Sequence, residues 1–152
     1  MKQPAFFLLL ALVLTMILPS CQVNKWEDWK LKNELWMANN KTQPGVITTA
    51  SGLQYKVIHQ GYMRNPNSTS SIEVNYTGAL IDGSVFDSGT KSWFSLASAI
   101  KGWQEGIPKM NGGGTYIFYI PASLGYDTIT TNLKIPPHST LIFQVDLVDS
   151  YN

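Results

Sequence analysis

Side chains that could transfer a proton or hold a metal are few and scattered in this sequence of 152 residues. The two histidines, His59 and His138, are far apart, and neither has a cysteine or acidic partner at metal-ligand spacing. The run Gly112-Gly113-Gly114 precedes a predicted strand, whereas a phosphate-binding loop must lead into the N-terminus of a helix. No nucleophile is paired with a base as in a hydrolase. The sequence therefore predicts no metal site, no cofactor and no hydrolytic chemistry.

The residues that stand out instead are aromatic side chains near turns and loop ends. They are Tyr76, Phe86, Phe94, Trp103, Tyr126 and Phe143. In an arbitrary β-rich domain, a hydrophobic core alone would explain such a set. The short motifs that surround these residues favour a binding site.

These motifs occur in a fixed order along the chain. They are Val74-Asn75-Tyr76-Thr77-Gly78, Asp82-Gly83, Phe86-Asp87-Ser88, Ile100-Lys101-Gly102-Trp103-Gln104-Glu105-Gly106, Ile120-Pro121, Leu124-Gly125-Tyr126 and Ile135-Pro136-Pro137-His138-Ser139-Thr140-Leu141-Ile142-Phe143. Each motif alone is weak. Together, in this order and at this spacing, they resemble the FKBP family of peptidyl-prolyl cis–trans isomerases from Ser51 to about Ser150.

The resemblance implies a hydrophobic pocket for a prolyl ring. Trp103 would form its floor, and the walls would be Tyr76, Phe86, Phe94, Ala99, Ile100 and Phe143. Asp87 would be a polar wall residue, and Ile135 would pack at the lip. The Tyr126 hydroxyl and the Ile100 backbone N–H would donate hydrogen bonds to carbonyls of the bound peptide. The implied ligands are proline-containing peptides, unfolded exported proteins and macrolides.

Such a pocket needs no acid, base or cofactor. Rotation about a peptide bond is opposed by a resonance barrier of ~18–20 kcal/mol. In the twisted transition state the amide loses conjugation, so its carbonyl becomes less dipolar and depends less on water. A dry aromatic pocket therefore stabilises the twisted amide more than the planar one.

The sequence also departs from the family pattern. The segment Ser88–Trp93 is shorter than its counterpart and lacks the usual Arg, Ala99 replaces a usual Val, and Asp127 follows Tyr126 where Gly is common. One side of the pocket is therefore expected to be more open. An alternative function is a membrane-tethered binding module, an FKBP-like chaperone with little catalysis, and a third is a structural envelope lipoprotein.

The N-terminal residues predict export and a lipid anchor. The stretch Ala5–Leu18 is apolar except for Thr15, which fits a secretory signal spanning residues 1–20. It ends in Leu18-Pro19-Ser20-Cys21, which resembles a bacterial lipobox, so Cys21 is the expected lipidation site. Cys21 is the only cysteine, which excludes an internal disulfide; the alternative is a chance Cys after an ordinary signal peptide. We expect an extracytoplasmic lipoprotein held on a membrane of the bacterial periplasm or at the outer membrane.

Residues 25–39 lack Gly and Pro and predict a helix, followed by a linker over 40–50. Trp26, Trp29 and Trp36 share one side of this helix, which could lie on lipid or pack on the following domain. Residues 21–50 thus form an N-terminal extension, and 51–152 the isomerase-like domain. Without the first 20 residues, ten basic side chains balance ten acidic ones, so nothing favours binding to nucleic acid. With only one short helix outside the domain, a monomer is expected.

Alternating apolar residues and turn signals predict the elements of the domain. Strands are expected at 53–58, 72–80, 85–86, 115–120 and 140–148, with a single helix at 96–103. This is an α+β pattern in which one helix covers one face of an antiparallel sheet. The family resemblance further implies that the sheet is strongly bent around that helix.

Overall fold

The computed structural model describes residues 25–128 and 134–151. The predicted signal peptide and Cys21 lie outside these residues. The helices are α1 (Lys25–Asn40) and α2 (Lys101–Gly106), with 3-10 turns η1 (Leu96–Ser98), η2 (Ile107–Lys109) and η3 (Ala122–Leu124). The strands are β1 (Val46–Thr48), β2 (Gln54–His59), β3 (Ser71–Ala79), β4 (Val85–Ser95), β5 (Thr115–Ile120) and β6 (Leu141–Tyr151).

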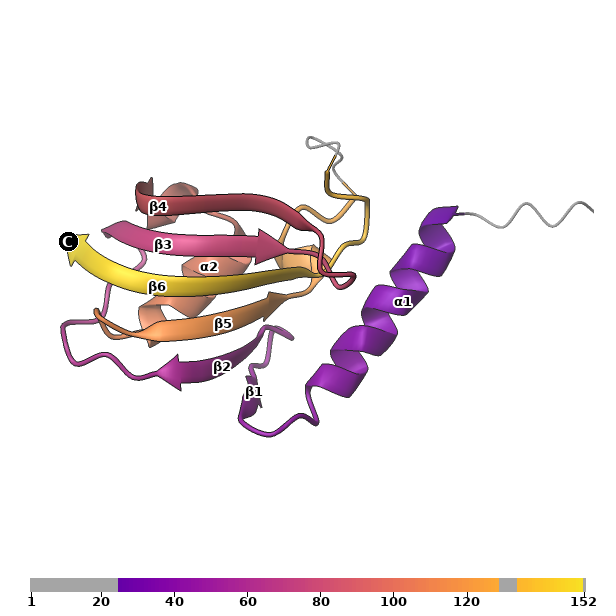
Figure 1. Cartoon of the computed structure of the whole chain (residues 1–152), viewed down its shortest axis with the longest axis horizontal. Helices are drawn as coiled ribbons and strands as arrows, with labels where there is room; N and C mark the ends of the chain where they lie inside the picture. The colour runs from indigo at the N-terminus through magenta and orange to yellow at the C-terminus, as the bar shows by residue number, and fades with distance from the viewer. Residues whose placement is uncertain (1–24, 129–133, 152) are drawn as a thin grey trace, which may run out of the picture.

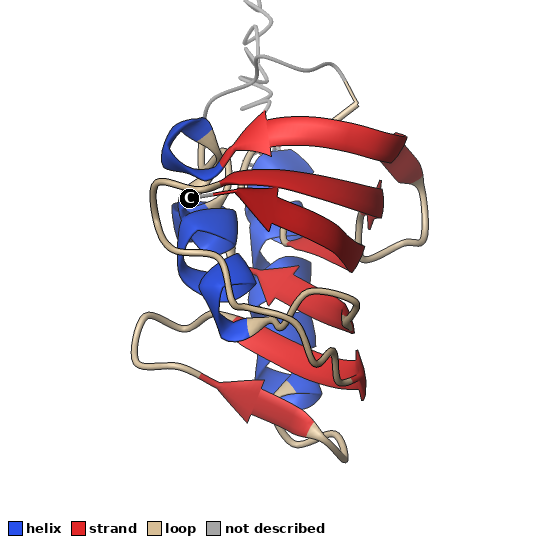
Figure 2. Cartoon of the chain, turned by 90° about the vertical axis from the view of Figure 1, so that its left-hand side faces the viewer, coloured by secondary structure: helices blue, strands red, loops and turns tan. Residues whose placement is uncertain are grey.

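The six strands form one antiparallel sheet in the order β1-β2-β5-β6-β3-β4. The sheet curves, and α2 lies against one of its faces while α1 runs past the end of the sheet at which β5 finishes and β6 begins (Figures 1 and 2). This confirms the predicted α+β fold, with a bent sheet around a short helix and a preceding N-terminal helix.

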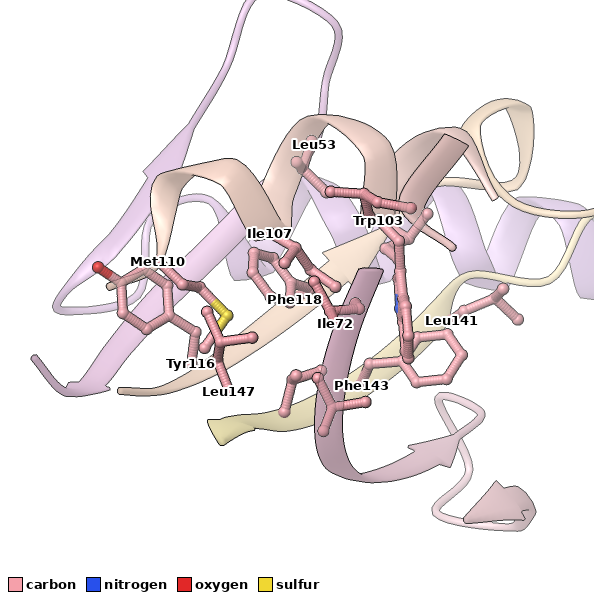
Figure 3. Close-up of a cluster of buried hydrophobic side chains, with 14 of the residues drawn as sticks. Leu53, Ile72, Trp103, Ile107, Met110, Tyr116, Phe118, Leu141, Phe143 and Leu147 are labelled. Atoms are coloured by element: carbon pink, nitrogen blue, oxygen red, sulfur yellow. The ribbon is translucent and has the colours of Figure 1, made fainter. Parts of the chain in front are cut away.

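Apolar side chains alternate with other side chains along β3 and β6, and this alternation decides which face of the sheet is buried. In β3, Ile72 and Val74 are fully buried, and in β6 the alternating residues Leu141, Phe143, Val145 and Leu147 are buried. These side chains meet Trp103, Ile107 and Met110 from the helical segment 101–110, which closes the core (Figure 3). The close approach requires a glycine in α2, because a Cβ on Gly102 would lie 2.5 Å from Ile120 Cγ2.

The structure corrects the predicted helix over 96–103. Residues 96–98 form the 3-10 turn η1, and the α-helix begins only at Lys101. Ala99 and Ile100 have extended backbone angles, with ψ of 169° and 151°, which interrupts any continuous helix. The helix then runs to Gly106, three residues beyond the predicted end.

Two predicted connections belong to the sheet. The segment 88–93, where no strand was expected, lies within β4 and pairs with β3 across one register shift, between Val74 and Tyr76. The expected linker over 40–50 contains the short strand β1, which pairs with β2. Neither was visible in the sequence, because β1 has only three residues and the part of β4 after Phe86 contains Gly89 and lacks alternating apolar residues.

Helix α1 packs on the domain, which confirms the second of the two predicted roles of its tryptophans. Trp29 Nε1 donates a 2.9 Å hydrogen bond to Ser139 Oγ, and the Trp36 ring lies 5.6 Å from that of Tyr119. At the C-terminal end of α1, Asn40 Nδ2 donates to Gln54 Oε1 at 2.9 Å. No helix within residues 25–128 and 134–151 is long and apolar enough to span a membrane.

Candidate functional site

A cavity of about 270 Å³ opens between α2 and the concave face of the sheet. Its walls come from β3, β4, the 96–103 segment, β6 and the loop that follows β5. It is lined by Tyr76, Asp87, Phe94, Ser98, Ala99, Ile100, Trp103, Tyr126 and Phe143. All but Ser98 were predicted, and Ser98 was missed because a serine in a short 3-10 turn carries no distinctive sequence signal.

The floor of this cavity is a cluster of aromatic rings around Trp103. The rings of Tyr76, Phe94 and Phe143 meet the Trp103 ring nearly edge-on, with centroids 5.5, 5.3 and 5.3 Å away. Edge-to-face contacts of this kind stabilise one another and hold the rings in fixed positions. Trp103 Nε1 is buried and has no hydrogen-bond partner among the described residues, so this N–H is not exposed in the cavity.

Phe86 and Ile135, also predicted for the site, are buried but do not line the cavity. Phe86 packs behind Phe143, with centroids 5.4 Å apart and ring planes at 88°. Gly78 leaves room for this pair, since a Cβ there would lie 2.6 Å from Phe86 and 2.7 Å from Phe143. Ile135 belongs to the hydrophobic core. Phe86 thus supports the wall from behind.

A bulge in the pairing of β3 with β4 gives the cavity its polar side. Gly78 pairs with Asp87 and Ala79 with Val85, so Phe86 is an extra residue in β4. A bulge re-aims the side chains next to it. As a result the Asp87 carboxylate reaches Tyr76, whose hydroxyl donates a 2.9 Å hydrogen bond to Asp87 Oδ2.

The two tyrosines of the site remain neutral well above physiological pH. Burial, followed by the hydrogen bond to the Asp87 carboxylate, raises the pKa of Tyr76 to about 12. Burial and the negative charge of Asp87 also raise the pKa of Tyr126. Both groups therefore keep the proton that a hydroxyl needs in order to donate a hydrogen bond.

Two predicted donors lie at the edge of the cavity. Tyr126 is 37% exposed and lies in the loop after β5, where a ligand can reach its hydroxyl. Ile100 is the N-cap of α2, and its carbonyl accepts hydrogen bonds from Trp103 N (2.9 Å) and Gln104 N (3.1 Å). Gln104 Nε2 also donates to the carbonyl of Ala99 at 2.7 Å, which fixes the turn before the helix. The Ile100 N–H takes no part in these bonds.

The arrangement offers an apolar floor, fixed aromatic walls, and the Tyr126 hydroxyl and the Ile100 N–H as donors at the rim. Among residues 25–128 and 134–151, no group of three or more His, Cys, Asp or Glu side chains could hold a metal ion. Such a site can bind a small apolar ring and hydrogen-bond the backbone on either side of it.

Two family models match the chain. The model described as FKBP-type peptidyl-prolyl cis-trans isomerase matches residues 63–148, more than half of the sequence. The model described as the domain amino terminal to FKBP-type peptidyl-prolyl isomerase matches residues 20–57.

Similar proteins carry related names. The outer membrane protein MIP of Legionella longbeachae is 38% identical over 128 residues, which are 82% of this chain and 55% of that protein. A probable FKBP-type peptidyl-prolyl cis-trans isomerase FkpA of Neisseria meningitidis is 44% identical over 78% of this chain and 45% of that protein. The chain thus spans about half the length of these relatives.

Solved structures have the same fold. A peptidyl-prolyl cis-trans isomerase from Pseudomonas syringae superposes with a TM-score of 0.79 at 30% identity, covering 83% of this chain and 96% of that one. FkpA from Escherichia coli gives a TM-score of 0.78 at 35% identity, covering 82% and 60%.

Proposed function

This chain belongs to the FKBP-type peptidyl-prolyl cis-trans isomerase family, and we propose that it catalyses cis–trans isomerisation of X–Pro bonds. The observation that carries this proposal is the cavity floored by Trp103, with the Tyr126 hydroxyl at its rim. A cavity of about 270 Å³ has room for a prolyl ring and for the first atoms of the residues on either side of it.

Catalysis is proposed to come from differential binding. The prolyl ring lies on Trp103 between Phe143 and Phe94, and the aromatic walls exclude water from the amide. The twisted amide loses conjugation and with it part of its dipole, so a dry site favours the twisted state over the planar one. Tyr126 and the Ile100 N–H hold carbonyls on either side while the bond rotates. Asp87 tunes the polarity of the wall through its contact with Tyr76.

The proposed clients are unfolded exported proteins that contain proline. The support is the predicted signal segment 1–20 and a relative named as an outer membrane protein. We further propose that Cys21 is lipidated and tethers the domain to a membrane through its N-terminal extension. Because each buried CH₂ contributes ~0.8 kcal/mol, two or more acyl chains hold a protein stably. Macrolides that mimic a prolyl peptide are proposed to occupy the same cavity.

An isomerisation assay on the non-acylated protein tests the proposed activity. A peptide with one X–Pro bond, shifted to its cis form and followed over time, should relax faster in proportion to the protein concentration. A macrolide should slow this relaxation. Tyr62→Phe, which changes a tyrosine that is 88% exposed and does not line the cavity, is the control and should leave the rate unchanged.

A binding module with little catalysis is the second candidate. It is favoured by the 88–93 segment, which belongs to β4 and therefore forms no loop over the cavity. This candidate predicts that proline peptides bind, and that aggregation of an unfolded protein is suppressed, with no faster relaxation of the X–Pro bond.

A further inference from the structure

The segment that carries Tyr126 is held together at its base. Residues 121–140 connect β5 to β6, with Tyr126 in the first described arm (121–128) and Ile135 in the second (134–140). The backbone N–H of His138 donates to the carbonyl of Asp127 at 2.8 Å, so the second arm is bonded directly beside Tyr126. In the first arm, Asp127 N also donates to Ala122 O at 2.9 Å. The position of Tyr126 therefore depends on where residues 136–140 lie.

Helix α1 fixes those residues. The side-chain oxygen of Asn33 accepts a 2.7 Å hydrogen bond from the backbone N–H of Thr140, and both residues are only 2% exposed. Trp29 Nε1 donates to Ser139 Oγ at 2.9 Å, and Ser139 Oγ donates in turn to the carbonyl of Pro136 at 2.7 Å. These hydrogen bonds hold the residues on both sides of His138 in place.

The Asn33 amide is held in one orientation. Its Nδ2 donates to the carbonyl of Trp29 at 2.8 Å while its Oδ1 accepts from Thr140. Turning the amide over would place a donor against the Thr140 N–H and an acceptor against the Trp29 carbonyl, and both bonds would be lost. Because the site is buried, water cannot replace them. Asn33 is thus bonded at once to α1 and to Thr140, the residue just before β6.

We propose that Asn33 and Trp29 are positioning residues for Tyr126, so that a helix outside the catalytic cavity sets the geometry of a donor within it. No residue of α1 lines the cavity, and the proposed coupling runs through residues 136–140 and the His138–Asp127 hydrogen bond. The inference rests on the proposed isomerase function for its kinetic consequence, but not for the structural coupling itself.

Two matched substitutions on α1 separate this coupling from a general loss of packing. Trp29→Phe keeps an aromatic ring and removes the N–H that bonds Ser139. Trp36→Phe makes the same change at a residue whose ring packs on Tyr119 of β5 rather than on Ser139. Asn33→Ala is the stronger variant, and Trp29→Phe serves if Asn33→Ala fails to fold.

Amide hydrogen exchange of the full chain tests the coupling without any assay of activity. The His138 N–H is the informative group, because neither substitution removes its own acceptor, the carbonyl of Asp127. Trp29→Phe should speed its exchange by about three- to tenfold, which is the expected effect of losing one neutral hydrogen bond. Trp36→Phe should leave it within about twofold of the unsubstituted protein. Equal exchange of the His138 amide in the two variants would overturn the coupling.

Kinetics then test whether the coupling acts through Tyr126. Trp29→Phe should lower kcat/KM by about three- to tenfold. In a Tyr126→Phe background the same substitution should cost less than about twofold, because the hydroxyl that it misplaces is already absent. A merely structural role would give the same factor in both backgrounds and would refute the proposal. An inactive unsubstituted protein would instead refute the proposed function, and the exchange of the His138 amide would still decide the coupling.

Discussion

The hydroxyl of Tyr76 on β3 and the carboxylate of Asp87 on β4 are joined by a 2.9 Å hydrogen bond at the edge of the cavity. Asp87 reaches this position because Phe86 is an extra residue in the pairing of the two strands. This one bulge in β4 therefore places the Phe86 ring behind the Phe143 wall and the Asp87 carboxylate at the edge of the cavity.

Asp87→Leu tests the polar side of the cavity. The substitution removes the acceptor of the Tyr76 hydroxyl and the negative charge beside Tyr126, so kcat/KM should fall by more than in Tyr126→Phe and by less than in Phe143→Ala. Asp87→Asn is the control, because it keeps an oxygen that can accept from Tyr76. If Asp87→Leu retains full activity, the carboxylate has no part in catalysis.

Tyr126→Phe should reduce activity only modestly. It removes the one hydrogen bond proposed to a substrate carbonyl, which typically contributes ~0.5–1.5 kcal/mol and corresponds to about two- to twelvefold in rate. The measurement is kcat/KM on a prolyl peptide, with the melting temperature as the check on folding. A loss above about a hundredfold would assign Tyr126 a larger role than a single neutral hydrogen bond allows.

Removing an aromatic wall should cost more activity than removing a donor. Phe143→Ala opens the cavity directly, whereas Phe86→Ala removes the ring that packs behind Phe143. Each change can also cost roughly 3–5 kcal/mol of stability, so rates must be compared at a temperature where both variants are folded. We expect a large loss of kcat/KM in both. A folded Phe86→Ala variant with normal activity would contradict the desolvated-pocket mechanism.

The rate should be nearly independent of pH between about 6 and 8, because Tyr76, with a pKa of about 12, and Tyr126, with a raised pKa, stay protonated. The raised pKa of Tyr76 also makes the stability of the fold depend on alkaline pH. The unfolded chain loses tyrosine protons above about pH 10, while native Tyr76 keeps its proton. The contribution of Tyr76 to the free energy of unfolding is therefore complete below about pH 10 and is lost as the pH rises toward 12.

Denaturant unfolding at a series of alkaline pH values measures this loss. Tyr76→Phe should make the free energy of unfolding fall less steeply above about pH 10, and Tyr62→Phe should leave the slope unchanged. An identical slope in Tyr76→Phe would contradict the raised pKa.

Cys21→Ser tests the lipid anchor. Produced in a bacterium that processes lipoproteins, the unsubstituted chain should incorporate labelled fatty acid and sediment with membranes. The serine variant should lose the label, because serine has no thiol for the thioether bond. A serine variant that is still labelled would exclude Cys21 as the lipidation site.

The sequence was most informative where side chains alternate between two environments. The buried faces of β3 and β6 followed from Ile72 and Val74 and from Leu141, Phe143 and Val145, because strand periodicity reports burial directly. The lining of the cavity was anticipated only through the family resemblance, since aromatic residues in a core and in a pocket look alike in sequence.

What could not be predicted depends on contacts between distant residues. The break between η1 and α2 is imposed by the extended backbone at Ala99 and Ile100, although the residues on both sides are compatible with a helix. Asn33 on a predicted helix reads as an ordinary surface residue. Its role becomes visible only when Thr140, 107 positions away, is found beside it.

The place of β6 in the sheet determines when this protein can fold. It lies between β5 and β3, so residues 141–151 supply the hydrogen bonds that join the two halves of the sheet. Until residues 141–151 have been synthesised, β5 and β3 lack the strand that lies between them, so each of the two sets of strands has an unpaired edge. Completion must wait for long-range pairing, which is slow compared with local helix formation. The sheet of this domain can therefore close only after residues 141–151 have been synthesised.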